Sequence, residues 1–188
     1  GEGLLFLTPH LGCFEITSLW ASQWLPLTIQ YRPPRQPWLG QWLTAGRSRG
    51  GVTLAPAELR GVRQLVAALR RGEAVGLLPD QTPKAGEGVW APFFGRPAWT
   101  MTLAARLSLM PQVTTVMVWG ERLPRGAGFR LHFWPLTWRQ ADEPMPERVA
   151  AINREVEIAI RRAPDQYLWG YPRYKAPAGV ALPHKERS

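Results

Sequence analysis

The chain has 188 residues, 45% of them hydrophobic and 20% charged, which excludes a disordered chain and suits one domain with a single core. Its formal net charge of +9 favours an anionic partner, such as nucleic acid, anionic lipid or an acidic carrier protein. The sequence has no apolar run near the roughly 20 residues that span a bilayer, and its single cysteine, Cys13, excludes an internal disulfide.

The first half of the chain alternates apolar runs with helical patterns. A continuous apolar run ended by Pro9 predicts a strand over residues 4–8, and further strands are predicted over residues 27–31, 52–55 and 74–78. Apolar residues at helical spacing predict helices over residues 13–24, 39–45 and 58–71. The apolar face expected for the first helix is Ile16, Leu19, Trp20 and Trp24, and that expected for the last is Leu59, Val62, Val66 and Leu69.

The second half begins in a turn-rich loop, PDQTPKAGEG, and then resumes the alternation. Extended segments are predicted over residues 89–94, 113–119 and 129–134, the last two joined by a turn. Helices are predicted over residues 99–108 and 146–162. The buried face expected for the last helix is Val149, Ile152, Val156 and Ile160. The whole pattern predicts a single α/β domain over residues 1–188, with a mixed, mostly parallel central sheet flanked by helices.

Two chemically useful side chains directly follow predicted strands. His10 comes after the first strand, and Asp80 comes after the strand that ends near Leu78. In open α/β sheets the ligand site lies beyond the carboxyl ends of the strands. His10 and Asp80 are therefore expected to share one edge of the sheet, although they are 70 positions apart.

The stretch LTPHLGCFE joins the first predicted strand to the first predicted helix. Gly12 lets the backbone turn tightly, and Glu15 falls in the first helical turn, where the helix dipole favours an ionised carboxylate. If Glu15 accepts a hydrogen bond from one ring nitrogen of His10, the other nitrogen is free to take a proton from a hydroxyl. The spacing alone also fits a histidine that caps the helix or fills a polar gap beneath it.

Four longer motifs follow in order: QYRPPRQPWL, AGRSRGG, LLPDQTPKAGEGVWAPFFGRPA and PDQYLWGYPRYK. Together with LTPHLGCFE they resemble the bacterial lipid A biosynthesis acyltransferases, the late lauroyl and myristoyl transferases of the lysophospholipid acyltransferase superfamily. The likeness runs from about Leu4 to Lys175, and the stretch that begins LLPDQTP is its most specific part. It implies a glycerolipid acyltransferase-like fold.

The resemblance implies a role for each matching residue. His10 is expected to be the general base, and Glu15 is expected to be its partner. The residues expected to bind substrate are Gly12, Tyr31, Arg32, Arg47, Arg49, Asp80 and Gln81. Among them Arg47, or else Arg49, should hold a phosphate or the developing oxyanion, because a guanidinium donates two parallel hydrogen bonds to such groups.

The reaction implied by the resemblance moves a fatty acyl chain from acyl carrier protein to a hydroxyl of a lipid A precursor, late in lipopolysaccharide biosynthesis. It needs neither a metal nor a cofactor. The expected partners are acyl-acyl carrier protein, a phosphorylated glycolipid and an anionic membrane surface, with no nucleic acid. The implied location is the cytoplasmic face of the inner membrane, reached peripherally or through an N-terminal anchor segment that would precede residue 1.

Other functions fit parts of the same pattern. The acceptor could be another glycolipid, such as an acylated mannoside, or a glycerophospholipid, although Asp80 and Gln81 replace the Pro-Glu-Gly-Thr type expected of glycerol-phosphate enzymes. A basic module that binds membranes without activity fits the charge, and so does a nucleic-acid module, for which no motif is seen. A hydrolase or thioesterase with Cys13 or a serine as nucleophile fits the nearby histidine, but a Gly-x-Ser-x-Gly elbow is absent from the sequence.

Overall fold

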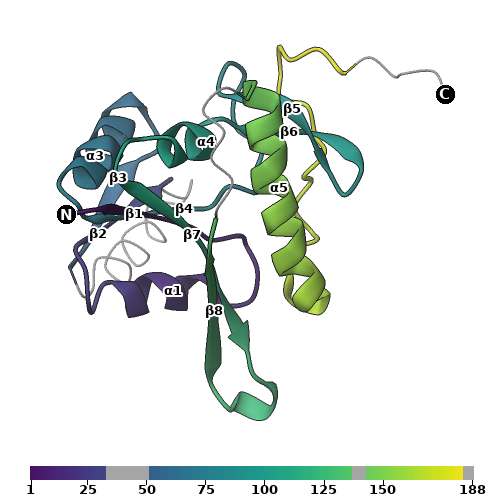
Figure 1. Ribbon diagram of the computed structural model, residues 1–188. Coiled ribbons are helices and arrows are strands. Elements are labelled where there is room, and N and C mark those ends of the chain that lie inside the picture. The colour runs from purple at the N-terminus through teal and green to yellow at the C-terminus, as the bar shows by residue number, and fades with distance from the viewer. Residues whose placement is uncertain (33–50, 137–142, 184–188) are drawn as a thin grey trace.

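A mixed six-stranded sheet forms the centre of the protein (Figure 1). The computed structural model describes residues 1–32, 51–136 and 143–183. The strands of the sheet are β1 (Gly3–Leu7), β2 (Leu27–Tyr31), β3 (Val52–Pro56), β4 (Ala74–Leu77), β7 (Val113–Arg122) and β8 (Phe129–Pro135). Their order is β3-β2-β4-β1-β7-β8, and every neighbouring pair is parallel except β7 with β8. This arrangement confirms the predicted α/β class with a mixed, mostly parallel sheet.

Helices cover both faces of the sheet (Figure 1). On one face α1 (Phe14–Ala21) contacts β2 and β7. On the other face α3 (Leu59–Arg70) packs against β1, β2, β3 and β4, and α4 (Leu103–Ser108) packs against β1 and β7. The long helix α5 (Met145–Arg162) lies beside α4.

The alternating side chains of β1 separate two hydrophobic clusters. Leu5 and Leu7 are fully buried and belong to the large core beneath α3, α4 and α5. Leu4 and Phe6 pack against the smaller cluster beside α1. Full burial of a leucine side chain contributes about 1.5 to 3 kcal/mol, so β1 is held strongly in the sheet. The loop that follows β1 therefore starts from a rigid base.

A hairpin of β5 (Gly88–Phe93) and β6 (Arg96–Met101) follows the turn-rich loop. The predicted extended segment over residues 89–94 is confirmed, but the predicted helix over residues 99–108 is wrong in its first part, because β6 occupies it. Trp90 and Trp99 are paired across the hairpin, with ring centroids 5.5 Å apart in edge-to-face geometry. Cross-strand aromatic pairs stabilise a hairpin, and here this pairing outweighs the helical pattern of the segment.

The predicted apolar face of α1 lies partly in solvent, since Leu19, Trp20 and Trp24 are 38%, 39% and 71% exposed. Thr17 and Ala21 are buried instead. These small side chains let the helix approach the sheet closely, so the large residues are displaced toward its edges.

The other predicted helical faces agree better with the structure. In α3 the buried residues are Gly61, Leu65, Ala68 and Leu69. Of the predicted residues, Leu69 is buried, whereas Leu59 is 68% exposed. The predicted face of α5 is confirmed, because all four of its residues are buried: Val149, Ile152, Val156 and Ile160. The helix predicted over residues 39–45 lies outside the described residues.

Candidate active site

Two loops meet at the carboxyl edge of the sheet, one after β1 and one after β4. These strands are parallel neighbours in which Leu7 pairs with Leu77, and the N–H of Thr8 continues the ladder by donating to the Leu77 carbonyl at 2.9 Å. Both chains therefore leave the sheet side by side. As predicted, His10 and Asp80 lie together at one edge.

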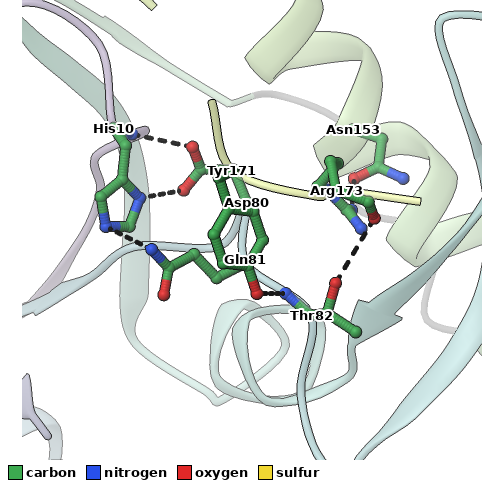
Figure 2. A network of polar contacts seen from close by, with 7 residues as sticks. All are labelled: His10, Asp80, Gln81, Thr82, Asn153, Tyr171 and Arg173. Atoms are coloured by element: carbon green, nitrogen blue, oxygen red, sulfur yellow. Dashed lines mark hydrogen bonds and ion pairs between the residues drawn. The ribbon is translucent and has the colours of Figure 1, made fainter. Parts of the chain in front are cut away.

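The carboxylate of Asp80 holds His10 by two hydrogen bonds (Figure 2). The imidazole Nδ1 lies 2.8 Å from Oδ1 of Asp80, and the backbone N–H of His10 donates to Oδ2, also at 2.8 Å. Because a carboxylate can only accept, Nδ1 carries the proton and Nε2 keeps its lone pair. The Asp80 side chain is 2% exposed and that of His10 is 15% exposed, so the imidazole alone reaches outward.

The side-chain amide of Gln81 contacts Nε2, the nitrogen of the His10 ring that keeps its lone pair. Its Nε2 lies 3.1 Å from Nε2 of His10, within reach of a hydrogen bond donated to the lone pair (Figure 2). An amide N–H and an alcohol O–H can both donate at this position. A bound alcohol can therefore replace Gln81 and place its own proton on the histidine.

Glu15 lies in the first turn of α1 and lines the same cavity as His10. A hydrogen bond between Glu15 and His10 was expected, but the imidazole has other partners. Its Nδ1 contacts Asp80 and its Nε2 contacts Gln81. The loop after β4 leaves the sheet beside the imidazole and supplies both of these partners. From α1 it is the first residue, Phe14, that contacts the imidazole, with the two ring centroids 5.0 Å apart. The role of Glu15 as partner of the base stays a prediction.

An open cavity of about 550 Å³ adjoins this histidine. It extends from the α1 face of the sheet across the carboxyl edge to α3 and α4. Its apolar lining includes Phe6, Ile29, Leu59, Val62, Met101 and Leu103. A space of this size, with a largely apolar lining and polar side chains among it, is typical of a small-molecule site.

The predicted substrate-binding residues have different positions relative to this cavity. Gln81 and Arg32 line it. Tyr31, at the end of β2, is buried and 8% exposed. Arg47 and Arg49 lie outside the described residues, so their predicted contact with phosphate stays a prediction.

Comparison with known protein families shows which family this chain matches. The family model described as bacterial lipid A biosynthesis acyltransferase matches residues 1–176. The chain belongs to this family. The resemblance seen in the sequence motifs is thereby confirmed.

Individual members of the acyltransferase family show the same relationship. The chain is 32% identical over 93% of its length to the lipid A biosynthesis palmitoleoyltransferase of Escherichia coli, and 28% identical over 95% to the lauroyltransferase of that organism. It is 25% identical over 90% of its length to the lipid A biosynthesis acyltransferase of Haemophilus influenzae. The chain spans only 52% to 58% of the length of these three relatives.

Gly12 has a conformational role in this family member. Its φ is +60°, and a Cβ atom there would lie 2.0 Å from the carbonyl oxygen of Gly120. Its own carbonyl accepts a hydrogen bond from Nη1 of Arg122 at 2.6 Å. Gly12 therefore lets the loop that carries His10 pass against β7, and it is not among the residues that line the cavity.

We expect Gly12→Ala to lower the free energy of unfolding by at least about 2 kcal/mol, because it adds a steric collision with backbone to an unfavourable φ. Denaturant unfolding measures this change. The matched control is Gly95→Ala, whose φ is +72° but whose Cβ would have no atom within 4 Å. It should cost roughly 1 kcal/mol, and equal losses in the two variants would show that the close approach to Gly120 is unimportant.

A C-terminal segment, residues 164–175, supports the loop that carries His10. We call this segment the strap. The N–H of Leu168 in the strap donates to the carbonyl of His10 at 3.1 Å, and the N–H of Gly12 donates to the carbonyl of Gln166 at 3.0 Å. The backbone on both sides of His10 is thus anchored to the strap.

The strap also contacts the loop after β4. The hydroxyl of Tyr171 accepts a hydrogen bond from the N–H of Thr82 at 3.0 Å (Figure 2). Burial raises the pKa of Tyr167 well above its usual value, and the negative charge of Asp80 adds to that shift. No role for these tyrosines follows from the sequence, because the strap has no periodic pattern. Only its place in the motif PDQYLWGYPRYK singled it out.

The described ranges, 1–32, 51–136 and 143–183, contain neither a candidate metal site nor a candidate membrane span. No group of three or more His, Cys, Asp or Glu side chains in them could hold a metal ion. None of the helices in these ranges has the length and hydropathy needed to cross a bilayer.

Proposed function

We propose that this chain transfers a fatty acyl group from acyl carrier protein to a hydroxyl of a lipid A precursor, with His10 as the general base. Membership of the lipid A acyltransferase family supports this assignment. The observation that carries it is the pair of His10 and Asp80, in which Nδ1 is tied to a buried carboxylate and Nε2 keeps a lone pair beside an open cavity. This pairing prepares an imidazole to accept a proton.

The proposed reaction begins when an acceptor hydroxyl displaces Gln81 from Nε2 of His10. The imidazole removes the hydroxyl proton as the oxygen attacks the carbonyl carbon of the acyl thioester. Asp80 stabilises the imidazolium that forms, as a buried carboxylate does in other histidine-dependent acyl transfers. The C–S bond then breaks, the imidazolium returns its proton to the leaving thiolate, and an ester and a free thiol result.

The cavity has groups suited to both proposed substrates. Its apolar walls can surround an acyl chain, and Arg32 on its rim can hold a phosphate of the acceptor. Arg47 or Arg49 is proposed to add a second cation for a phosphate or for the developing oxyanion, which typically gains roughly 3 to 4 kcal/mol per donor.

The remaining partners are proposed from charge and family. An acyl carrier protein is acidic and an inner-membrane surface is anionic, and both match the net charge of +9. We place the protein at the cytoplasmic face of the inner membrane, where it would be peripheral or held by a segment that precedes residue 1.

Acyl transfer can be tested directly with purified protein. Incubation with acyl-acyl carrier protein and a tetra-acylated lipid A precursor should add the mass of one acyl chain to the precursor, measured by mass spectrometry. Parallel reactions with another glycolipid or a lysophospholipid test the alternative acceptors. Transfer to one of these alone would replace the proposed acceptor, and vesicle binding without any transfer would favour the inactive basic module.

The role of Glu15 has its own test. We expect Glu15→Gln to lower kcat by about 10- to 100-fold, because a carboxylate on the cavity wall should favour the imidazolium that forms at His10. The matched control is Glu87→Gln, which removes a carboxylate elsewhere on the same wall and should change kcat by less than about twofold. A kcat near the native value in Glu15→Gln would remove Glu15 from the mechanism.

A further inference from the structure

Only two charged side chains are classed as buried in the described part of the chain. They are Asp80, which is 3% exposed, and Arg173, which is 4% exposed. Asp80 holds His10 at the candidate active site, and Arg173 belongs to the strap. Figure 2 shows both residues in one polar network, on either side of Thr82.

The guanidinium of Arg173 contacts neutral oxygens. Its Nη1 donates to the carbonyl of Trp99 at 3.0 Å, and its Nη2 donates to Oγ1 of Thr100 at 2.6 Å. Nη2 also lies 3.5 Å from Oδ1 of Asn153. These oxygens accept from the two Nη atoms but not from the buried Nε, and they supply no negative charge. Burial of a charge without a compensating one is costly.

Asp80 can supply that compensation. Thr82, two residues after Asp80, donates to the carbonyl of Arg173, so the two buried charges lie in one connected network. Burial lowers the pKa of Arg173, and the carboxylate of Asp80 is among the groups that oppose this shift. Each of the two buried charges compensates the other. A buried carboxylate without a nearby cation tends to take up a proton, and a protonated Asp80 could no longer hold the Nδ1–H tautomer of His10.

Backbone contacts couple the same arginine to both loops of the site. The carbonyl of Arg173 accepts a hydrogen bond from Oγ1 of Thr82 at 3.4 Å, two residues after Asp80. Earlier in the strap, Leu168 binds the carbonyl of His10. Because the guanidinium fixes the strap to β6 and α5, it also fixes the segment on which the His10 and Asp80 loops rest.

We propose that Arg173 is a positioning residue, which balances the buried charge of Asp80 and thereby keeps His10 in the tautomer with a lone pair on Nε2. The proposal rests on the proposed function, since a general base requires that tautomer. Arg173 acts through Asp80 and the strap and does not touch the reacting atoms. The other titratable groups around this network are Glu15 on α1 and three tyrosines of the strap, Tyr167, Tyr171 and Tyr174.

Nitrogen NMR of isotope-labelled histidine tests this proposal without any substrate, because a protonated ring nitrogen and one with a lone pair resonate apart. The chain has three histidines, and the signals absent from His10→Ala identify those of His10. Native protein should show one fixed tautomer. Arg173→Met should show averaged His10 signals, whereas Arg173→Lys, which keeps the charge, should retain the fixed tautomer.

The matched control is Arg96→Met, which removes an exposed guanidinium that lies 4.1 Å over the ring of Tyr174 in the same strap. It should leave the His10 signals unchanged. In the transfer assay Arg173→Met should lower kcat at least about 10-fold with KM within about threefold, because positioning affects the reacting state more than binding. A fixed tautomer in folded Arg173→Met, or averaged signals in Arg173→Lys, would overturn the proposal.

Two further comparisons keep this test decisive. If Arg173→Met does not fold, Thr100→Val removes the acceptor at 2.6 Å and should average the His10 signals in part, whereas unchanged signals would overturn the proposal. If native protein transfers no acyl group but Arg173→Met still loses the fixed tautomer, the proposed function fails while the positioning role stands.

Discussion

Replacing His10 by alanine is expected to lower kcat for acyl transfer by about 100- to 10,000-fold, the range that a positioned general base supplies. The acceptor hydroxyl would then have to lose its proton to water, at the edge of a cavity whose neighbouring groups are already hydrogen-bonded. The fold should survive, because the His10 side chain reaches the cavity and is not part of the hydrophobic core. Transfer from acyl-acyl carrier protein, followed by mass spectrometry, measures the change.

Cys13→Ala is the control for this loss. Cys13 is three residues from His10, is partly buried and is a free thiol, so it is the alternative nucleophile near the base. Under the general-base mechanism this variant should keep kcat within about twofold of the native value, as expected for a minor change at a partly buried position. Loss of transfer in Cys13→Ala to the level of His10→Ala would instead favour a covalent acyl-enzyme. Near-native turnover in His10→Ala would contradict the proposed mechanism itself.

Asp80→Asn should be nearly as damaging as loss of the histidine, with kcat lower by about 100- to 10,000-fold. The amide keeps the shape of the carboxylate but can offer only one oxygen. If that oxygen accepts from the backbone N–H of His10, the amide nitrogen faces Nδ1 and favours the tautomer with its proton on Nε2. The base would then be protonated at the wrong nitrogen.

Asp165→Asn is the matched control, because Asp165 is an exposed aspartate at the start of the strap. It should leave kcat and stability close to native. The comparison of Asp80→Asn with Glu15→Gln also decides which carboxylate orients the imidazole. Full activity in Asp80→Asn together with loss in Glu15→Gln would assign that task to Glu15.

Most of the fold could be predicted because its signals are local. The strands β1 and β4 are continuous apolar runs close to Pro or Gly, and buried parallel strands have this pattern. The face of α5 was predicted correctly because four apolar residues repeat at helical spacing over its whole length. The local sequence of these segments is enough to predict their structure.

The errors arose where tertiary contacts outweighed local patterns. The first residues of the predicted helix over residues 99–108 instead belong to β6, which pairs with β5 along its whole length, Trp99 with Trp90 included. In α1 the large residues Leu19 and Trp20 were expected inside, but the buried positions of this helix are taken by the small side chains of Thr17 and Ala21. Neither contact can be inferred from spacing along the chain.

Only the part of the site that follows from the order of the parallel strands could be predicted. A parallel sheet brings the residues after β1 and β4 to one edge, which was enough to place His10 beside Asp80. The choice between Asp80 and Glu15 as hydrogen-bond partner depends on the paths of two loops, and no periodic signal describes those paths. The support from Arg173 was hidden for the same reason, since it comes from a segment without regular structure.

The position of the strap along the chain has a consequence for how the protein matures. All six strands of the central sheet have been synthesised once Pro135 is added, yet the strap residues that bind the His10 loop come only after α5. A nascent chain on the ribosome can therefore contain the complete sheet, with Asp80, before the strap is there to hold the loop. Catalytic activity should therefore arise late, after residue 175 has been translated and the strap has docked.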